Sequence, residues 1–240
     1  CRFSEELTEV EIRPGDYHFS EKLDADQLKD GWMPFGACET WGGRDRHFWF
    51  RTKVVIRKEW AGKEVRVTLN TGADDIWNTD NPQIMAYKNG ILSGTMDMNH
   101  QDLILAEEAE EAEVFELVFY AYSNSENPTN FFHLKAAVYD REIADLYYDL
   151  KVPFEAAELC SEEDLDRIEA MKFLNTAISG LDLRKPGSEE FYQSVREVRE
   201  YVKKNLPDIC RSSRVTVHSI GHTHIDVAWK WPLRQTRQKA

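Results

Sequence analysis

The sequence is poor in cysteine, and its four cysteines are far apart: Cys1, Cys38, Cys160 and Cys210. They form no Cys-x-x-Cys pair, so neither a zinc ribbon nor a redox motif of that type is indicated. Their low density also argues against a disulfide framework, and the reducing cytoplasm is the simpler interpretation. We therefore expect a cytoplasmic protein.

Long apolar runs and an excess of basic residues are also lacking. No stretch approaches the roughly 20 apolar residues that span a bilayer, and the N-terminus lacks the apolar segment of a signal peptide. The formal net charge is -13, from 30 Lys and Arg against 43 Asp and Glu. A polyanion would be repelled, because no Lys/Arg stripe interrupts the acidic balance. The sequence thus predicts neither a membrane nor a nucleic-acid partner.

What is present is typical of a folded protein. A hydrophobic fraction of 42% and a charged fraction of 30% are ordinary for folded proteins and argue against disorder. The 240 residues allow one large domain or two modest ones. The chain begins at Cys1 without Met, and it ends at Ala240 within a helical pattern that has no Gly or Pro to stop it. We therefore expect a piece of a longer protein.

Residues 1–155 are predicted to form an antiparallel β-sandwich. Short segments rich in aromatic and β-branched residues alternate with turn residues, which is typical of such domains. The predicted strands cover residues 47–56, 64–70, 84–87, 91–92, 114–122 and 131–138. Between two of them, Asn89-Gly90 indicates a type I′ hairpin turn.

Residues 156–210 are predicted to form a helical linker. Ser161 and Asp164 have the spacing of a capping box, and apolar residues recur at helical intervals over residues 165–178. A second helix follows, and we expect it to stop before Pro207.

Residues 211–240 are predicted to be the truncated start of an α/β domain. A strand at Val215–Ile220, a polar loop and a helix from about Pro232 form the unit that opens a parallel α/β fold. The fold class expected for the chain is therefore α+β, a multi-domain fragment.

The loop of this last section contains His222-Thr223-His224-Ile225-Asp226. If the backbone stays extended there, His222, His224 and Asp226 project from one side at the end of a strand, where α/β folds place active sites. Imidazole nitrogen and carboxylate oxygen are ligands that zinc accepts. A His-x-His pair also arises by chance, so spacing alone leaves a metal site and a structural role open. Structural or surface roles are expected of the four histidines without such neighbours: His18, His47, His100 and His133.

The stretch Ser219–Pro232, with Thr236 and Lys239 beyond it, resembles the first conserved block of the family 38 glycoside hydrolases. It is most similar to their bacterial and cytosolic-type branch, which carries Gly-x-x-His-Ile-Asp-x-Ala-Trp-x-Trp-Pro. The passage Asp149–Phe154 and its surroundings are also similar to the region upstream of that block. The resemblance implies that this chain is the N-terminal part of a zinc-dependent α-mannosidase.

The resemblance also implies roles for single residues. His224 and Asp226 correspond to zinc ligands, whereas His222 corresponds to a residue beside the ligands. Trp229 corresponds to the tryptophan that lines the subsite for the mannose ring. Two further ligands, one of them the nucleophilic aspartate, and the general acid/base lie well downstream in the family. No catalytic residue is therefore expected within residues 1–240.

The implied activity is retaining hydrolysis of terminal α-linked mannose in a seven-stranded, barrel-like α/β catalytic domain. The partner would be a mannose-containing oligosaccharide, and the sequence leaves a homo-oligomer open. Zinc would bind two hydroxyls of mannose and help to distort its ring. With half of the ligand set, residues 1–240 alone are expected to bind zinc weakly and not to hydrolyse an aryl α-mannoside.

Two other functions stay open on the sequence. The sandwich could be a non-catalytic carbohydrate-binding module, with sugars stacked on Trp41, Trp49 or Trp77, although aromatics within strand patterns are more often core residues. The His-x-His pair also begins the site of metal-dependent amidohydrolases. In those enzymes both histidines coordinate, and Asp226 and the Ala228–Pro232 run are not part of their pattern.

Overall fold

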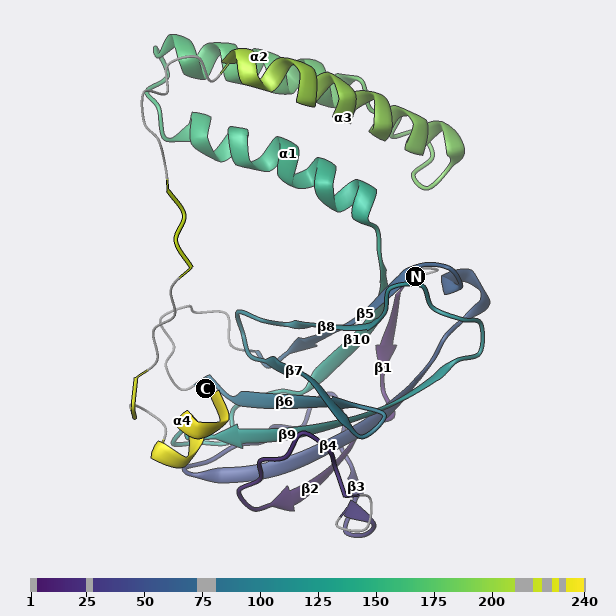
Figure 1. Cartoon of the computed structure of the whole chain (residues 1–240), viewed down its shortest axis with the longest axis vertical. Helices are drawn as coiled ribbons and strands as arrows, with labels where there is room; N and C mark the ends of the chain where they lie inside the picture. The colour runs from purple at the N-terminus through teal and green to yellow at the C-terminus, as the bar shows by residue number, and fades with distance from the viewer. Residues whose placement is uncertain are drawn as a thin grey trace. The chain divides into compact units, whose positions relative to one another are not determined.

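The structure is a computed structural model that describes residues 4–24, 28–72, 81–209, 218–221, 226–228 and 232–239. The chain divides into two compact units (Figure 1). Unit 1 comprises Cys1–Tyr139 together with Thr223–Ala240, and unit 2 comprises Asp140–His222. Each unit is described by itself below.

Unit 1 contains two antiparallel sheets. The six-stranded sheet has, in order across it, β3 (Met33–Pro34), β2 (Glu11–Gly15), β4 (Arg46–Val55), β9 (Val114–Ser123), β6 (Gln83–Lys88) and β7 (Ile91–Met96). The four-stranded sheet has β1 (Ser4–Leu7), β10 (His133–Tyr139), β5 (Glu64–Asn70) and β8 (Asp102–Ala106). The predicted antiparallel, β-rich N-terminal domain is confirmed.

Alternation along the strands builds the core between the sheets. In β4, Phe50 and Val54 are buried in the cluster between the two sheets, while Trp49 belongs to a second cluster on the other face. The Phe50 and Phe132 rings are stacked with centroids 3.8 Å apart. The predicted hairpin turn is also confirmed, because Asn89 and Gly90 both have positive φ, at 51° and 79°.

The outer face of the six-stranded sheet is buried as well. Its cluster of Trp49, Met85, Tyr87 and Tyr120 is covered by Leu23, Leu28 and Trp32 from the segment that joins β2 to β3. The Tyr87 hydroxyl donates a hydrogen bond to the Ser20 carbonyl over 2.8 Å, which ties this segment to β6. A sheet covered on both faces can therefore carry aromatic residues at successive positions, as β4 does.

Burial raises the pKa of Tyr87 to about 12, and this has a consequence for stability at high pH. An unfolded tyrosine loses its proton near pH 10, whereas the folded Tyr87 keeps its proton, so deprotonation favours the unfolded state. The stability present below pH 10 is then lost as the pH rises toward 12. Phenylalanine has no proton to lose, so over this rise in pH the free energy of unfolding of Tyr87→Phe should fall by roughly 2–3 kcal/mol less than that of the unchanged chain.

The measurement is unfolding in urea at pH values from 9 to 12, monitored by far-UV circular dichroism. Tyr148, which is 57% exposed on a helix of unit 2, supplies the control variant Tyr148→Phe, whose pH dependence should equal that of the unchanged chain. An equal loss of stability with pH in Tyr87→Phe and the unchanged chain would contradict the prediction.

Unit 2 is a three-helix unit of α1 (Arg141–Glu158), α2 (Leu165–Ser179) and α3 (Glu189–Ile209). Its core is formed by residues from all three helices: Leu146, Phe173, Leu174, Ala177, Phe191, Val195, Val198 and Val202. Asp140 caps α1 by accepting a hydrogen bond from the Ile143 amide over 3.1 Å, and it also accepts one from the Tyr192 hydroxyl over 2.6 Å. The carboxylate of Asp140 raises the pKa of Tyr192 to about 12.

Three expectations for the helices need correction. The sandwich was predicted to extend to residue 155, but β10 ends at Tyr139 and α1 follows at once. Pro153 lies inside α1, and because proline is rare within helices, the sequence did not indicate a helix there. α3 also continues through Pro207, close to its end, where few intrahelical hydrogen bonds are lost. The N-cap of α2 is Asp164 and not the predicted Ser161, because the Asp164 carboxylate accepts from the Asp166 amide over 2.9 Å.

The C-terminal segment is described in part. The predicted helix from about Pro232 is confirmed as α4 (Leu233–Lys239). The first three residues of the predicted strand Val215–Ile220 lie outside the described residues, and its last three are described without strand structure.

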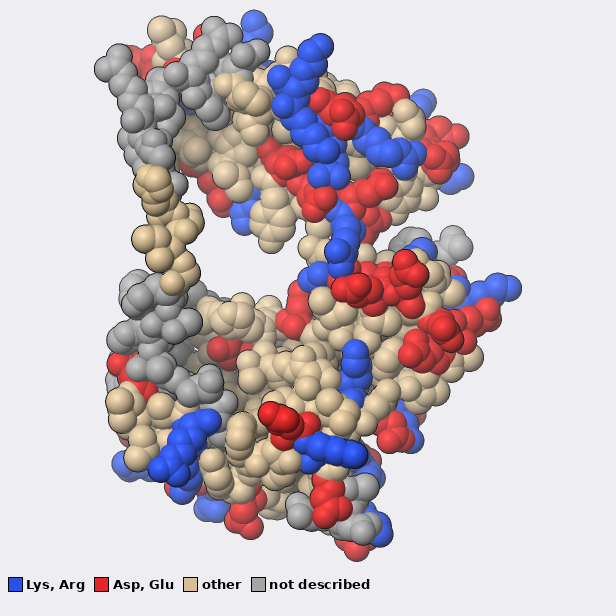
Figure 2. All heavy atoms as spheres, viewed as in Figure 1, with Lys and Arg blue, Asp and Glu red and all other residues tan. Residues whose placement is uncertain are grey.

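The surface agrees with the acidic, mixed charge of the sequence. On the face shown in Figure 2, Lys and Arg side chains are interspersed with Asp and Glu. Within the described residues, no helix has the length and apolar character needed to cross a membrane.

Candidate active-site loop

The predicted metal motif is only partly within the described residues. Asp226 is described and partly exposed, whereas His222, His224 and Trp229 lie outside the described residues. Among the described residues, no group of three or more His, Cys, Asp or Glu side chains could hold a metal ion. The donor chemistry of the motif, one carboxylate and two imidazoles, fits zinc. The roles assigned to these side chains stay predictions.

Helix α4 is tied to the loop that contains Asp226. The hydroxyl of Thr236 donates a hydrogen bond to the Val227 carbonyl and lies 3.5 Å from the Asp226 carbonyl oxygen. Both contacts are made to the backbone, so they fix the course of the loop at Asp226 and Val227. Thr236 is thus a residue that positions the loop.

Arg234 of α4 contacts the sandwich within unit 1. Its Nη2 atom lies 2.5 Å from Oδ1 of Asp45 and 3.3 Å from Nε2 of His47. Its guanidinium lies 5.7 Å from the centroid of the Tyr17 ring, and the Tyr17 hydroxyl donates to the Arg234 carbonyl over 3.2 Å. One arginine therefore joins the helix after the motif to the start of β4.

His47 is the sandwich residue at the centre of this contact. Burial, and then the positive charge of Arg234, lower the pKa of His47, so its ring is held neutral. Arginine only donates hydrogen bonds, so Nε2 of His47 must accept from Arg234. The proton of the neutral ring is then on Nδ1, which donates to the Tyr120 hydroxyl 2.6 Å away. A neutral histidine at this place avoids repulsion with Arg234.

The other histidines have structural or surface contacts, as expected. His18 packs against Trp49 with ring centroids 4.8 Å apart, and His100 is an exposed residue 3.1 Å from the Asp97 carboxylate. Nε2 of His133 lies 2.6 Å from the Ala37 carbonyl oxygen. None of these side chains belongs to a described metal-binding cluster.

Two of the three tryptophans suggested for a sugar-binding module are buried. Trp41 is 2% exposed and Trp49 is 5% exposed, so both are core residues. Trp77 lies outside the described residues.

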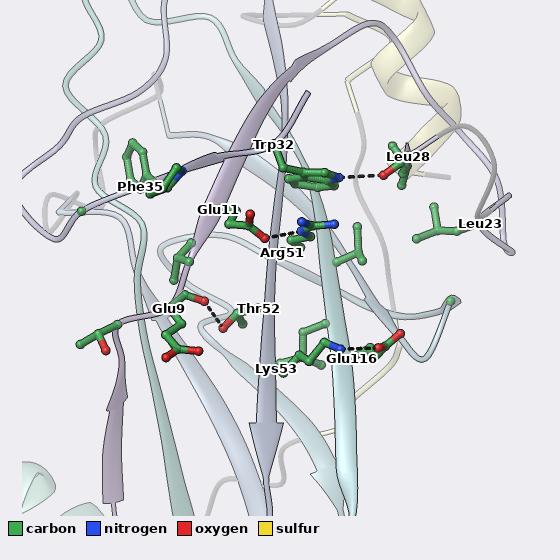
Figure 3. A pocket seen from close by; sticks show the side chains of 17 residues that line it. Glu9, Glu11, Leu23, Leu28, Trp32, Phe35, Arg51, Thr52, Lys53 and Glu116 are labelled. Atoms are coloured by element: carbon green, nitrogen blue, oxygen red, sulfur yellow. Dashed lines mark hydrogen bonds and ion pairs between the residues drawn. The ribbon is translucent and has the colours of Figure 1, made fainter. Parts of the chain in front are cut away.

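The sandwich instead has a pocket that the strand patterns did not predict. Its volume is about 820 Å³, and it lies between β2, β4, β9 and the segment that precedes β3 (Figure 3). Trp32 lines it beside Arg51 and Glu11. Trp32 stands in Asp30-Gly31-Trp32, outside every predicted strand, and an aromatic residue in such a turn is the one sequence signal for this site.

Comparison with known proteins places the motif in a family. Residues 214–240 match the model described as glycosyl hydrolases family 38 N-terminal domain. Alpha-mannosidase 2C1 of Mus musculus is 24% identical over 209 residues, which cover 80% of this chain and 19% of the mouse protein. Alpha-mannosidase G of Dictyostelium discoideum is 23% identical over an alignment of 252 residues, and this alignment covers 98% of this chain and 22% of that protein.

The chain thus spans about a fifth of the length of the curated relatives it matches. Among solved structures, beta-glucuronidase 2 of Bacteroides uniformis is 12% identical, and the match covers 56% of this chain and 18% of that chain at a TM-score of 0.40. The family model covers the segment with the His222–Asp226 motif, and the relatives extend the similarity over most of the chain. By this match, the C-terminal segment of the chain is similar to the N-terminal domain of the family 38 glycoside hydrolases.

Proposed function

We propose that the protein to which this chain contributes hydrolyses terminal α-linked mannose from glycans. The observation that carries the proposal is the block around His222–Asp226, which falls within the family match at residues 214–240. The relatives named above are α-mannosidases by name, which supports mannose rather than another sugar. We also propose the cytoplasm as its location, because the four cysteines of the chain are few and far apart.

We propose His224 and Asp226 as two ligands of a zinc ion, with His222 beside them and Trp229 against the mannose ring. Bound zinc would supply a fixed positive charge for sugar hydroxyls. Asp226 contributes a negative oxygen donor whose backbone is held by the Thr236 hydroxyl. Trp229 would offer an apolar ring face to the C–H face of the sugar. Together these residues bind and orient the substrate.

We propose a retaining reaction in the α/β domain that residues 211–240 would begin. One carboxylate attacks the anomeric carbon while an acid protonates the leaving oxygen, and water then releases the sugar. The resemblance assigns both groups to positions after residue 240. The share of this chain in catalysis is therefore to hold part of the metal site and one wall of the sugar subsite.

The experiment is metal removal and replacement in the full-length protein, with an aryl α-mannoside as substrate. We expect chelation to abolish hydrolysis and added zinc to restore it, while the matching aryl β-mannoside is not cleaved. Full activity after complete metal removal would contradict the zinc requirement. Absence of hydrolysis by the zinc-loaded, folded protein on every α-mannoside tested would contradict the mannosidase.

The competing amidohydrolase interpretation receives no support from the relatives named above, whose names are all those of mannosidases. The carbohydrate-binding interpretation of the sandwich does have a specific observation in its favour. That observation is the pocket beside Trp32, which lies away from the tryptophans first considered.

A further inference from the structure

We propose that the pocket beside Trp32 binds a neutral oligosaccharide, a function beyond the hydrolase activity proposed above. The pocket is about 820 Å³, within the ~300–1,000 Å³ typical of small-molecule sites. Its lining combines apolar side chains with polar groups that converge from β2, β4 and β9 (Figure 3). Such a mixture is what recognition of a polyhydroxylated ring requires, because sugars have apolar C–H faces and hydroxyl edges.

The aromatic wall of the pocket is held in place. The indole Nε1 of Trp32 donates a hydrogen bond to the Leu28 carbonyl over 2.7 Å, and the Arg51 guanidinium lies 4.5 Å from the indole centroid. Leu23 and Leu28 pack beside this ring in the outer-face cluster. The tryptophan is therefore oriented before any ligand arrives, which lowers the entropic cost of binding.

The polar wall consists of two ion pairs on the neighbouring strands β2, β4 and β9. Nε of Arg51 lies 2.5 Å from the Glu11 carboxylate, and Nζ of Lys53 lies 2.8 Å from the Glu116 carboxylate. Hydrogen bonding from Arg51 lowers the pKa of Glu11, so this carboxylate stays ionised. Each pair places carboxylate acceptors beside cationic donors.

These pairs select the charge of the ligand. Both cations of the lining are matched by carboxylates, and Glu9 adds a third carboxylate, so an anionic ligand meets net negative charge. A cationic ligand would find the carboxylates of Glu11 and Glu116 already paired with Arg51 and Lys53. A sugar hydroxyl both donates and accepts, so it can bond to a carboxylate and its cation together without breaking the pair.

The test is titration of the 240-residue chain by ligand-observed NMR with mannobiose, cellobiose, lactose and maltotriose. Digalacturonic acid and the glucosamine dimer serve as the anionic and cationic probes. We expect at least one neutral sugar to bind with a saturable curve, and the two charged sugars to bind more weakly. Failure of every neutral sugar to saturate the chain, or stronger binding of a charged sugar, would overturn the proposal.

Two variants and two controls place the ligand in this pocket. Trp32→Ala and Arg51→Gln should each weaken binding about tenfold. Arg57 supplies the matched control, because it also pairs with a glutamate (Glu5) and lies over a tryptophan ring, outside the pocket lining and at nearly the same exposure as Arg51. Arg57→Gln and Tyr148→Ala should leave the affinity within about twofold.

Equal losses in the pocket variants and the controls would contradict the assignment. Thermal unfolding shows whether Trp32→Ala still folds, and Arg51→Gln tests the site independently, because its side chain lies at the surface. The same titration after treatment with a chelator separates this site from the metal motif. Binding that persists without metal supports the pocket, whereas binding that requires metal assigns the sugar to the motif and overturns the proposal. A failure of the hydrolase assay would leave this titration unchanged.

Discussion

Replacing Asp226 with alanine in the full-length protein is expected to reduce hydrolysis of an aryl α-mannoside by at least about 100-fold. Loss of a group that merely orients a metal ligand typically costs 10–100-fold, so loss of a ligand should exceed that range. Asp226→Asn keeps an oxygen donor without the negative charge, and we expect it to lie between alanine and the natural residue. Metal content measured on the same samples should fall in the same order.

The control for this series is Asp182→Ala. Asp182 is a carboxylate of unit 2 whose pKa is lowered to about 2 by a hydrogen bond from Arg184, and it lies in a described region away from the motif in sequence. Its loss should leave zinc content and kcat/KM unchanged, because it has no proposed contact with metal or sugar. Retention of both zinc and activity in Asp226→Ala would refute the ligand assignment. Loss of folding is recognised by circular dichroism before activity is compared.

The sequence predicted the central strands of the sandwich except β2, and it missed three of the four edge strands, β1, β3 and β8. β4 and β9 are rich in aromatic and β-branched residues, and β5 alternates with period two, so their patterns are clear. β1 and β8 lie at the ends of their sheet, where charged residues such as Glu5, Glu6 and Asp102 interrupt the apolar pattern. Edge strands carry such charges against aggregation, and this makes them hard to recognise.

Helix α1 was missed for a different reason. Its exposed face carries Tyr147, Tyr148 and Val152, residues that suggest strand or core when read along the sequence. Pro153 then appears to forbid a helix altogether. The helical signal is the Asp140 cap followed by Ile143, Leu146 and Leu150 at intervals of three and four residues.

The candidate site could be predicted only where local chemistry carries it. His224 and Asp226 are recognisable because their spacing and neighbours recur in a family, independently of any fold. The contacts of Arg234 with Asp45 and His47 join residues almost 190 positions apart, and no local pattern encodes such a pairing. The pocket beside Trp32 is likewise made by strands and a loop that meet only in the folded chain.

The second large effect concerns the stability of the sandwich. Phe50 is 0% exposed, stacks on Phe132 and meets Trp41 edge-on with centroids 5.2 Å apart. Phe50→Ala removes a ring from the core between the two sheets and leaves a cavity, because the surrounding side chains relax only in part. We expect a loss of about 3–5 kcal/mol in the free energy of unfolding of unit 1. This is a large share of the ~5–15 kcal/mol that stabilises a typical domain.

The tryptophans allow this loss to be measured in unit 1 alone. All seven tryptophans of the chain lie within residues 1–139 or 223–240, so their fluorescence during urea unfolding reports on unit 1 and not on the three helices of unit 2. The control is Phe19→Ala, because Phe19 is 51% exposed and should change the free energy of unfolding by less than about 0.5 kcal/mol. A Phe50→Ala transition that coincides with the Phe19→Ala transition would show that the aromatic core does not hold the sheets together. A fluorescence transition shifted to lower urea, with the helical signal of unit 2 unchanged in circular dichroism, would show that the two units unfold independently.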